Sequence, residues 1–194
     1  MNRSRFPSRQ IILVTGAARS GKSEWAETLA TQTGKSVVYV ATATIDPSDS
    51  QWQARIEKHR LRRPAEWQTL QVPIELAATF EAATPPQCLL VDSLGTWVAN
   101  LLDRDETTWE NIAFELLDRL QQAAVDIILV AEETGWGVVP AYPSGRLFRD
   151  RLGDLVRQIG AIADSVYLVV GGHVLNLTLL GKPLKNSKLS SQGN

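Results

Sequence analysis

The stretch Ile11-Ile12-Leu13-Val14-Thr15-Gly16-Ala17-Ala18-Arg19-Ser20-Gly21-Lys22-Ser23 decides the fold of this chain of 194 residues. An apolar run leads into the pattern G-x-x-x-x-G-K-S, and residues 24–30 after it have a helical composition. A strand, a glycine-rich loop and a helix in this order are typical of a phosphate-binding loop. Backbone N–H groups at the start of such a helix form a concave anion site. The alternative is a chance match in a glycine-containing turn, which the flanking strand and helix disfavour. The stretch therefore predicts that Gly16–Ser23 bind a nucleoside triphosphate, with Lys22 on the phosphates and Ser23 on Mg²⁺.

Composition favours a single soluble domain. The formal net charge of −1 gives no general attraction to nucleic acid or to anionic membranes. One cysteine, Cys88, lies in an apolar run, where we expect a buried side chain and no internal disulfide. No stretch approaches the roughly 20 apolar residues that span a bilayer. These features predict a cytoplasmic protein without a membrane span.

Apolar strand patterns alternate with helical patterns along the chain. We expect strands at 11–15, 36–41, 67–72, 88–92, 126–131 and 165–170, and a last, antiparallel strand at 174–180. Helices are expected after the glycine-rich loop and at 51–62, 74–83, 94–102, 109–124 and 147–163. This order predicts an α/β fold, a single P-loop NTPase domain of RecA-like type over 11–180, with a mostly parallel sheet and helices on both faces. Residues 1–10 are expected to form a flexible tail, and 181–194 a disordered one.

Acidic residues stand at the ends of two predicted strands, where ligands bind in parallel sheets. Asp92 follows four apolar residues, as expected of a second carboxylate that holds Mg²⁺. The alternative role is a cap for the helix expected from Leu94. Glu132 and Glu133 follow a later strand, where they either act on a substrate hydroxyl or Mg²⁺ or form a solvated pair.

His59 is one of two histidines and lies among basic residues. Positive neighbours depress a histidine pKa, and a neutral imidazole is a usable nucleophile toward phosphorus. The alternative is a packing residue, because Trp52 and Ile56 lie on the same predicted helical face and basic stripes are usually solvated. The pattern alone favours packing.

Several segments together make the chain resemble the bifunctional adenosylcobinamide kinase / adenosylcobinamide-phosphate guanylyltransferase family of cobalamin biosynthesis. The resemblance covers about residues 11–172, in order, and is far more specific than the phosphate loop alone. The segments that carry it are Val14–Ser23, Tyr39–Ala43, Arg55-Ile56-x-x-His59, Arg63-Pro64-Ala65-x-Trp67-x-Thr69, Leu89–Ser93 with Asn100–Leu102, Glu133-x-Gly135-x-Gly137-x-Val139-Pro140 and Arg146-x-Phe148-Arg149-Asp150 through Val170.

The resemblance implies an enzyme with two steps. ATP or GTP phosphorylates the aminopropanol hydroxyl of adenosylcobinamide, and GTP then gives GMP to a histidine and on to the new phosphate. The guanylylated histidine of the family maps to His59, with Lys22 as the other catalytic residue. Mg²⁺ would bind Ser23 and Asp92, and a homotrimer is implied. The nucleotide contacts would be Gly16, Ala17, Ala18, Arg19, Ser20, Gly21, Lys22, Ser23, Ala41, Thr42, Ala43, Arg60, Leu61, Arg62, Arg63 and Asp92.

The chain departs from the family pattern at three places, none of them in the phosphate loop. Lys58 precedes a single histidine where two adjacent histidines can occur. Gln71 stands where a glutamate is expected, and Arg157-Gln158 replaces an Asn-Gln pair. Two other functions remain open from the residues: a monofunctional small-molecule kinase, and a RecA-like ATPase or nucleotide switch. Neither a basic groove nor stacking aromatic residues favour a nucleic-acid partner.

Overall fold

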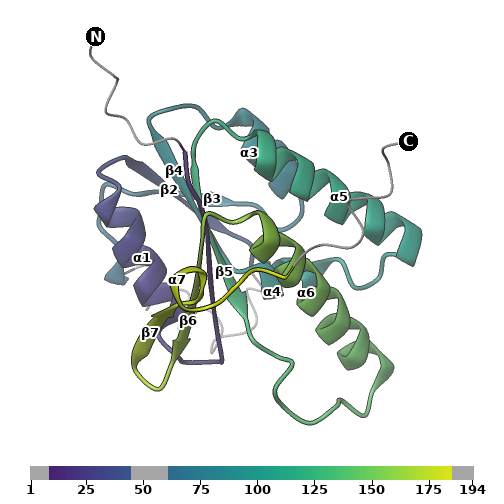
Figure 1. Ribbon diagram of the computed structural model, residues 1–194. Coiled ribbons are helices and arrows are strands. Elements are labelled where there is room, and N and C mark those ends of the chain that lie inside the picture. Colours follow the sequence, from purple (N-terminus) through teal and green to yellow (C-terminus); the bar gives the residue numbers. More distant parts are fainter. Residues whose placement is uncertain (1–8, 45–60, 185–194) are drawn as a thin grey trace, which may run out of the picture.

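The strand that precedes the glycine-rich loop lies inside the sheet. The computed structural model of the protein describes residues 9–44 and 61–184. Within them β1 (Ile11–Gly16) is buried along its whole length and pairs in parallel with β5 on one side and β6 on the other. The sheet has seven strands in the order β3-β2-β4-β5-β1-β6-β7 (Figure 1). An apolar strand without a polar face therefore lies where both faces are covered.

Strands and helices alternate as the sequence predicts. The other strands are β2 (Ser36–Ala41), β3 (Gln68–Gln71), β4 (Gln87–Asp92), β5 (Asp126–Glu132), β6 (Ser165–Val170) and β7 (His173–Asn176). The helices are α1 (Lys22–Gln32), α3 (Leu76–Ala82), α4 (Leu94–Asn100), α5 (Glu106–Gln122), α6 (Pro143–Ile162) and α7 (Leu177–Leu180).

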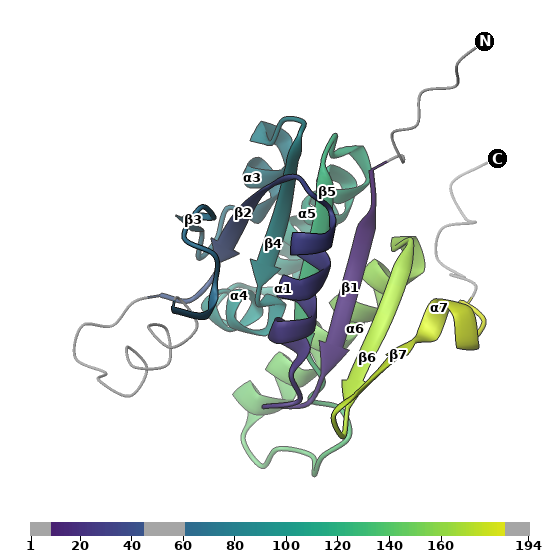
Figure 2. The ribbon, with the colours of Figure 1, turned by 90° about the vertical axis from the view of Figure 1, so that its left-hand side faces the viewer.

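Helices cover both faces of the sheet, and successive strand residues point to opposite faces. Ile12 and Val14 of β1 pack with Ala26 and Ala30 of α1. The opposite face packs against α3, α4, α5 and α6. Figure 2 shows α1 in front of the sheet and these helices behind it. The predicted architecture, one α/β domain with a mostly parallel sheet and helices on both faces, is thereby confirmed.

The parallel strands bring their carboxyl ends to one edge of the sheet. The loop from β1 to α1 and the long loop from β5 to α6 lie together at this edge (Figure 2). Gly16 pairs with Glu132, and the Glu133 N–H donates to the Gly16 carbonyl at 2.9 Å. The topology therefore joins the glycine-rich loop to the end of β5.

Two predicted elements near the C-terminus differ from the observed ones. The helix expected from Leu147 begins at Pro143, because proline is suited to the first helical position, where its missing N–H is not needed. The antiparallel strand expected over 174–180 is β7, which ends at Asn176. The Asn176 side chain accepts a hydrogen bond from the Leu179 N–H at 3.2 Å, and a short helix follows instead of a longer strand.

The other observed element ends differ from the predicted ones by a few residues. The helix expected from Trp109 begins at Glu106, because the Asp105 carboxylate caps it by accepting from the Thr108 N–H at 2.9 Å. These bonds lower the Asp105 pKa. Most of the predicted helix 51–62 lies outside the described residues, although Leu61 and Arg62 are helical.

Both predicted tails also lie mostly outside the described part of the chain. Within it, Gln10 is held by β5, since its N–H donates to the Asp126 carboxylate at 2.9 Å. Cys88 is buried as expected, and burial raises the pKa of its thiol to about 12. In the described ranges no helix has both the length and the apolar composition that crossing a membrane requires.

Candidate functional site

The loop between β1 and α1 has the backbone of an anion site. Gly21 lies at the N-cap of α1 with φ 95°, in the left-handed region that favours glycine, and no side chain caps the helix. The first N–H groups of α1 are thus left for a ligand. Gly16 has no space for a side chain, since an added Cβ would lie 2.5 Å from the Val169 carbonyl oxygen.

Lys22 lies across this loop. Its side chain is buried, and Nζ donates to the Ala17 carbonyl at 3.4 Å. The Ser20 N–H donates to the same carbonyl at 3.2 Å. The hydroxyl of Ser20 is buried and has no hydrogen-bond partner among the described residues. A buried polar group of this kind is usually satisfied, so a polar ligand in the loop would complete its bonding.

Asp92 ends β4 and lies half-buried. The Tyr39 hydroxyl donates to its Oδ2 at 3.0 Å, and the Arg63 guanidinium lies 3.6 Å from the centre of the Tyr39 ring. Burial of the phenol, together with the negative charge of Asp92, raises the Tyr39 pKa well above its usual value. Tyr39 therefore remains a neutral donor that orients the carboxylate.

Thr42 fastens the end of β2 to the end of β4. Its fully buried hydroxyl donates to the Ser93 carbonyl at 2.7 Å and accepts from the Ser93 N–H at 2.9 Å. The Asn100 side chain donates to the Thr42 carbonyl at 2.8 Å. Thr42 therefore fixes the backbone beside Asp92 and has its hydroxyl already engaged.

Arg62 attaches the segment after residue 60 to α1. Its Nε and Nη2 donate to the two carboxylate oxygens of Glu27 at 2.7 and 2.8 Å, and Nη1 donates to Glu24 at 2.7 Å. Burial opposes the charge on Arg62, but the bonds to Glu27 and the charges of both glutamates outweigh it and raise the pKa of Arg62. The end of the predicted helix 51–62 thus lies on the helix that starts at the phosphate loop.

Residues 12–177 match the family model described as cobinamide kinase / cobinamide phosphate guanyltransferase. The chain belongs to this family. The match includes the phosphate loop, Asp92 and Arg62, and it extends from the second residue of β1 through β7, so the family predicted from the sequence is confirmed.

Relatives within the cobinamide kinase family cover most of the chain. A protein of Pseudomonas aeruginosa named bifunctional adenosylcobalamin biosynthesis protein CobP is 43% identical over 89% of this chain and 98% of its own. Proteins named bifunctional adenosylcobalamin biosynthesis protein CobU, from Escherichia coli and Salmonella typhimurium, are 37% and 36% identical over 84% of this chain and 96% of their own.

A solved structure from Pyrococcus horikoshii OT3, of project PH0250, has a similar fold. Its TM-score is 0.55 over 93% of this chain and 90% of that chain, at 8% sequence identity. At this identity the likeness concerns the arrangement of the sheet and helices alone.

The structure brings together part of the site predicted for this member of the cobinamide kinase family. Ala41–Ala43 and Asp92 lie at the carboxyl ends of the adjoining strands β2 and β4, and the phosphate loop lies at the same edge, with β5 between β4 and β1. His59 and Arg60 lie outside the described residues. The alternative role of Asp92 as a helix cap is wrong, because Ser93 caps α4 by accepting from the Thr96 N–H.

Glu132 and Glu133 also lie at this edge. The Glu132 carboxylate accepts from the Gly95 N–H at 2.9 Å, in the first turn of α4, and Glu133 accepts from the Gly135 N–H at 3.0 Å. Glu132 is therefore partly buried and bonded to another element, and the alternative of a solvated pair does not describe it.

The sequence did not indicate the partners of the side chains that support the site. Tyr39 belongs to a predicted strand and to a segment that carries the family resemblance, and Glu27 belongs to a predicted helix, but their partners lie 53 and 35 residues away. Such contacts depend on the order of strands in the sheet.

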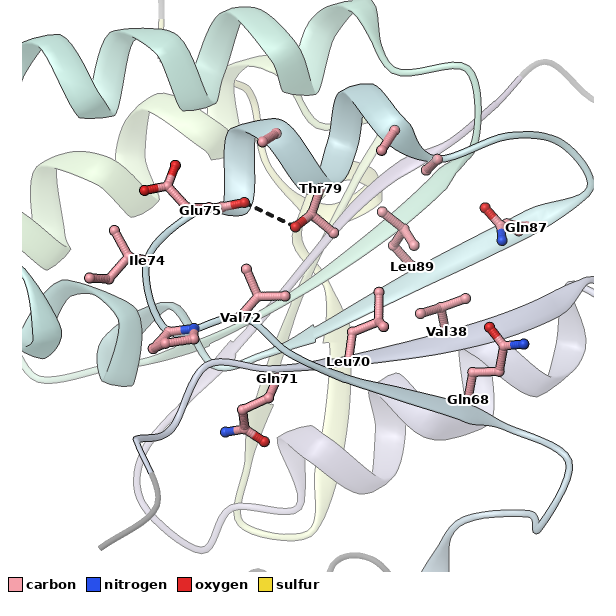
Figure 3. A pocket seen from close by; sticks show the side chains of 14 residues that line it. Val38, Gln68, Leu70, Gln71, Val72, Ile74, Glu75, Thr79, Gln87 and Leu89 are labelled. Atoms are coloured by element: carbon pink, nitrogen blue, oxygen red, sulfur yellow. Dashed lines mark hydrogen bonds between the residues drawn. The ribbon is translucent and has the colours of Figure 1, made fainter.

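Two hollows lie near these elements. One, of about 650 Å³, lies between β3 and α3 and is mainly apolar, with Leu70, Val72 and Leu89 on its wall (Figure 3). None of the predicted site residues that the structure describes lines it. The other, of about 670 Å³, lies between residues 132–135 and α6, next to the phosphate loop, and is lined by charged side chains.

Proposed function

We propose that this protein catalyses both reactions named by its family, in sequence, at the edge of the sheet that carries the phosphate loop. ATP or GTP would phosphorylate the aminopropanol hydroxyl of adenosylcobinamide. GTP would then donate its GMP, through a histidine, to the phosphate just formed, giving adenosyl-GDP-cobinamide. The observation that supports this most strongly is the family match over residues 12–177 together with a complete phosphate loop at the end of β1.

The phosphate loop would hold the triphosphate. The uncapped first turn of α1 offers N–H groups, and Lys22 would transfer its donor from the Ala17 carbonyl to a phosphate oxygen. A fixed cation and fixed N–H groups stabilise the charge that develops in attack on phosphorus. The same groups would therefore serve attack at the γ-phosphorus in the first reaction and at the α-phosphorus in the second.

Ser23 and Asp92 fit a magnesium site. In P-loop enzymes a serine or threonine hydroxyl and a carboxylate coordinate Mg²⁺. Ser23 and Asp92 provide these two groups, and both residues are half-buried at the carboxyl edge of the sheet. When bound, Mg²⁺ would neutralise phosphate charge. The Tyr39 hydroxyl, by donating to Oδ2 of Asp92, keeps this carboxylate in a fixed orientation.

His59 would carry the guanylyl group. A neutral imidazole nitrogen attacks the α-phosphorus of GTP, the bond to the bridging oxygen breaks, and pyrophosphate leaves. A phosphate oxygen of adenosylcobinamide phosphate then attacks the same phosphorus, the P–N bond breaks, and the histidine is restored. Arg62 supports this role indirectly, since its ion pairs with Glu27 and Glu24 hold the segment that follows His59 against α1.

Incubation with GTP labelled in the α-phosphate tests the proposal. We expect acid-labile, alkali-stable label on the precipitated protein, none on His59→Ala, and discharge of the label by adenosylcobinamide phosphate. Label from GTP labelled only in the γ-phosphate should not appear on the protein. A monofunctional kinase would take no label while still phosphorylating adenosylcobinamide. An ATPase of RecA type would instead hydrolyse ATP faster when nucleic acid is added, and would leave adenosylcobinamide unchanged.

Three further parts of the proposal rest on the family rather than on a contact in the structure. We propose a homotrimer in the cytoplasm, with Ala41–Ala43 and Arg60–Arg63 beside the bound nucleotide. Thr42 would contribute through its backbone position, because its hydroxyl is engaged with Ser93. Sedimentation of the purified protein measures the oligomer directly, and a monomeric mass would contradict the trimer.

A further inference from the structure

A charged cleft lies beside the phosphate loop, and none of the roles given above uses it. Residues 132–135 form one wall and α6 forms the other, through Arg149, Asp150, Gly153, Asp154, Val156 and Arg157; the cleft measures about 670 Å³. We call it the α6 cleft. Because Glu133 donates its N–H to Gly16, the wall of the α6 cleft is bonded to the start of the phosphate loop. A molecule in the α6 cleft would thus lie next to the triphosphate.

One donor in the α6 cleft has no partner among the residues that the structure describes. The Nη1 atom of Arg149 is buried and makes no hydrogen bond to any described residue. Its neighbours are engaged elsewhere: Arg157 donates to Asp154 at 3.1 Å, and Glu133 accepts from Gly135. A buried donor without an acceptor is unfavourable, and it is relieved when a ligand oxygen accepts from it.

Gly153 keeps the cleft open. It lies inside the helix α6, where glycine is unfavourable relative to alanine. An added Cβ would meet no atom within 4 Å, so packing does not require a glycine here. The missing side chain instead leaves free space on the α6 wall.

We propose that the α6 cleft binds the corrinoid acceptor through its carboxamide side chains, with Arg149 donating to an acceptor oxygen. This inference rests on the proposed function. Cobinamide is a corrin ring with primary carboxamides along its rim, and its cobalt(III) form carries positive charge. Each carboxamide offers a carbonyl to a guanidinium and an NH₂ to a carboxylate. Arg149 supplies the guanidinium, and the acidic residues of the cleft supply the carboxylates.

The charge of the α6 cleft distinguishes this ligand from a second nucleotide. Four carboxylates, Glu132, Glu133, Asp150 and Asp154, face two guanidinium groups. An excess of negative charge disfavours a triphosphate and favours a neutral or cationic molecule. The acceptor and the nucleotide would thereby bind in adjoining but separate places.

The loop that continues from the wall of the α6 cleft carries exposed apolar side chains. Trp136, Val138 and Tyr142 follow Gly135 in the same loop and are 68%, 95% and 78% exposed. Large apolar side chains exposed to this extent are available to cover an apolar ligand. A corrin ring, which is flat and largely apolar on its faces, would cover these side chains while its amide arms enter the cleft.

Two variants test the proposal by calorimetric titration of the full-length protein with adenosylcobinamide. Gly153→Gln places a side chain in the open space, and Arg149→Ala removes the unpartnered donor. We expect each variant to raise the Kd of adenosylcobinamide by about tenfold or more, while Gly153→Ala changes it less. Arg119→Ala, which removes a half-buried arginine on α5 that pairs with Glu81 and does not line the α6 cleft, is the charge control and should leave the Kd unchanged.

The same variants are labelled with GTP carrying the label in the α-phosphate. We expect wild-type labelling in all of them, with slower discharge by adenosylcobinamide phosphate in Arg149→Ala and Gly153→Gln. Equal losses with both corrinoids would assign Arg149 to a carboxamide oxygen, and a loss confined to the phosphorylated corrinoid would assign it to the phosphate. Either result supports the site.

Normal Kd values in Gly153→Gln and Arg149→Ala, with unchanged thermal unfolding, would overturn the proposal for the α6 cleft. Arg149→Lys guards against a folding defect, because it keeps the charge and should retain part of the affinity. The proposed function fails separately: in that case the wild-type protein itself takes no label from GTP.

Discussion

At the scale of single residues, the phosphate loop depends on the absence of a side chain at Gly16. An added Cβ would lie 2.5 Å from the Val169 carbonyl oxygen and 2.7 Å from Oγ of Ser20. The first of these atoms belongs to the backbone of β6, which pairs with β1 at this position. Neither strand can move away without losing that pairing, so the loop and the sheet constrain the same residue.

We therefore expect Gly16→Ala to destabilise the protein and to weaken nucleotide binding together. Inserting a methyl group into a packed site costs about 1–3 kcal/mol. For a chain of this size the melting temperature should fall by roughly 2–10 °C, measured by calorimetry. Gly160→Ala is a matched control, because its Cβ would lie 3.7 Å from Leu13, an ordinary contact. A Gly16→Ala protein with unchanged melting and unchanged Kd for GTP would contradict the steric argument.

Residue identities in the loop followed from its motif, but the partners of the supporting side chains did not. The motif predicts where Lys22 and Ser23 lie, because residues at these positions of the motif belong to the first turn of the helix that follows the loop. The bond from Tyr39 to Asp92 instead joins two strands whose adjacency is a property of the whole sheet. The same holds for Thr42 and Ser93, so sequence spacing predicted local contacts and missed these.

At the scale of elements, the contact between α1 and the segment 61–63 couples the phosphate loop to the residues after His59. Arg62 and Glu27 form a two-bond ion pair in which Glu27 is nearly buried. Bidentate pairs of this type are stronger and more directional than single charge contacts. Movement of α1 would therefore be transmitted to this segment.

A double-mutant cycle of Arg62→Ala and Glu27→Gln should reveal the coupling. We expect an interaction free energy of about 1–3 kcal/mol in urea unfolding, since charge-assisted bonds are partly shielded from water here. Both single variants should also label more slowly with GTP, because the segment that follows His59 is no longer held. The exposed pair Arg104 and Asp103, at 3.7 Å, should give a coupling near zero. Equal couplings for the two pairs would argue against a role for Arg62 in positioning.

Element types were predicted better than element ends. Short apolar runs, such as the one within 126–131, predict a buried strand. A parallel strand that is covered by helices on both faces has apolar side chains at successive positions. The ends depend on single capping residues. Pro143 precedes the helix predicted from 147 but starts α6, and Asn176 ends β7 by capping the next turn. Proline and asparagine both occur in turns as well as at helix starts, so the local sequence does not determine which of the two structures forms.

At the scale of the whole molecule, the position of β1 makes the loop sensitive to the stability of the entire sheet. β1 lies between β5 and β6, and β4, which carries Asp92, lies on the other side of β5. The groups proposed to hold the triphosphate and Mg²⁺ therefore come from different strands of one cooperative unit. A ligand that binds these groups only in the folded state must stabilise the fold as a whole.

GTP with Mg²⁺ should therefore raise the melting temperature in proportion to its affinity. At about 100 times its Kd, the nucleotide should add about 2.7 kcal/mol to the free energy of unfolding, or roughly 5–10 °C for a chain of this length. Removal of Mg²⁺ with EDTA should lower this gain, because phosphate charge would then face the Asp92 carboxylate directly. Asp92→Asn should abolish the difference between the two conditions, while Lys22→Ala should reduce the gain in both. A gain of the same size for all three proteins under both conditions would mean that GTP binds elsewhere in the molecule, since neither the loop lysine nor the β4 carboxylate would then contribute to its affinity.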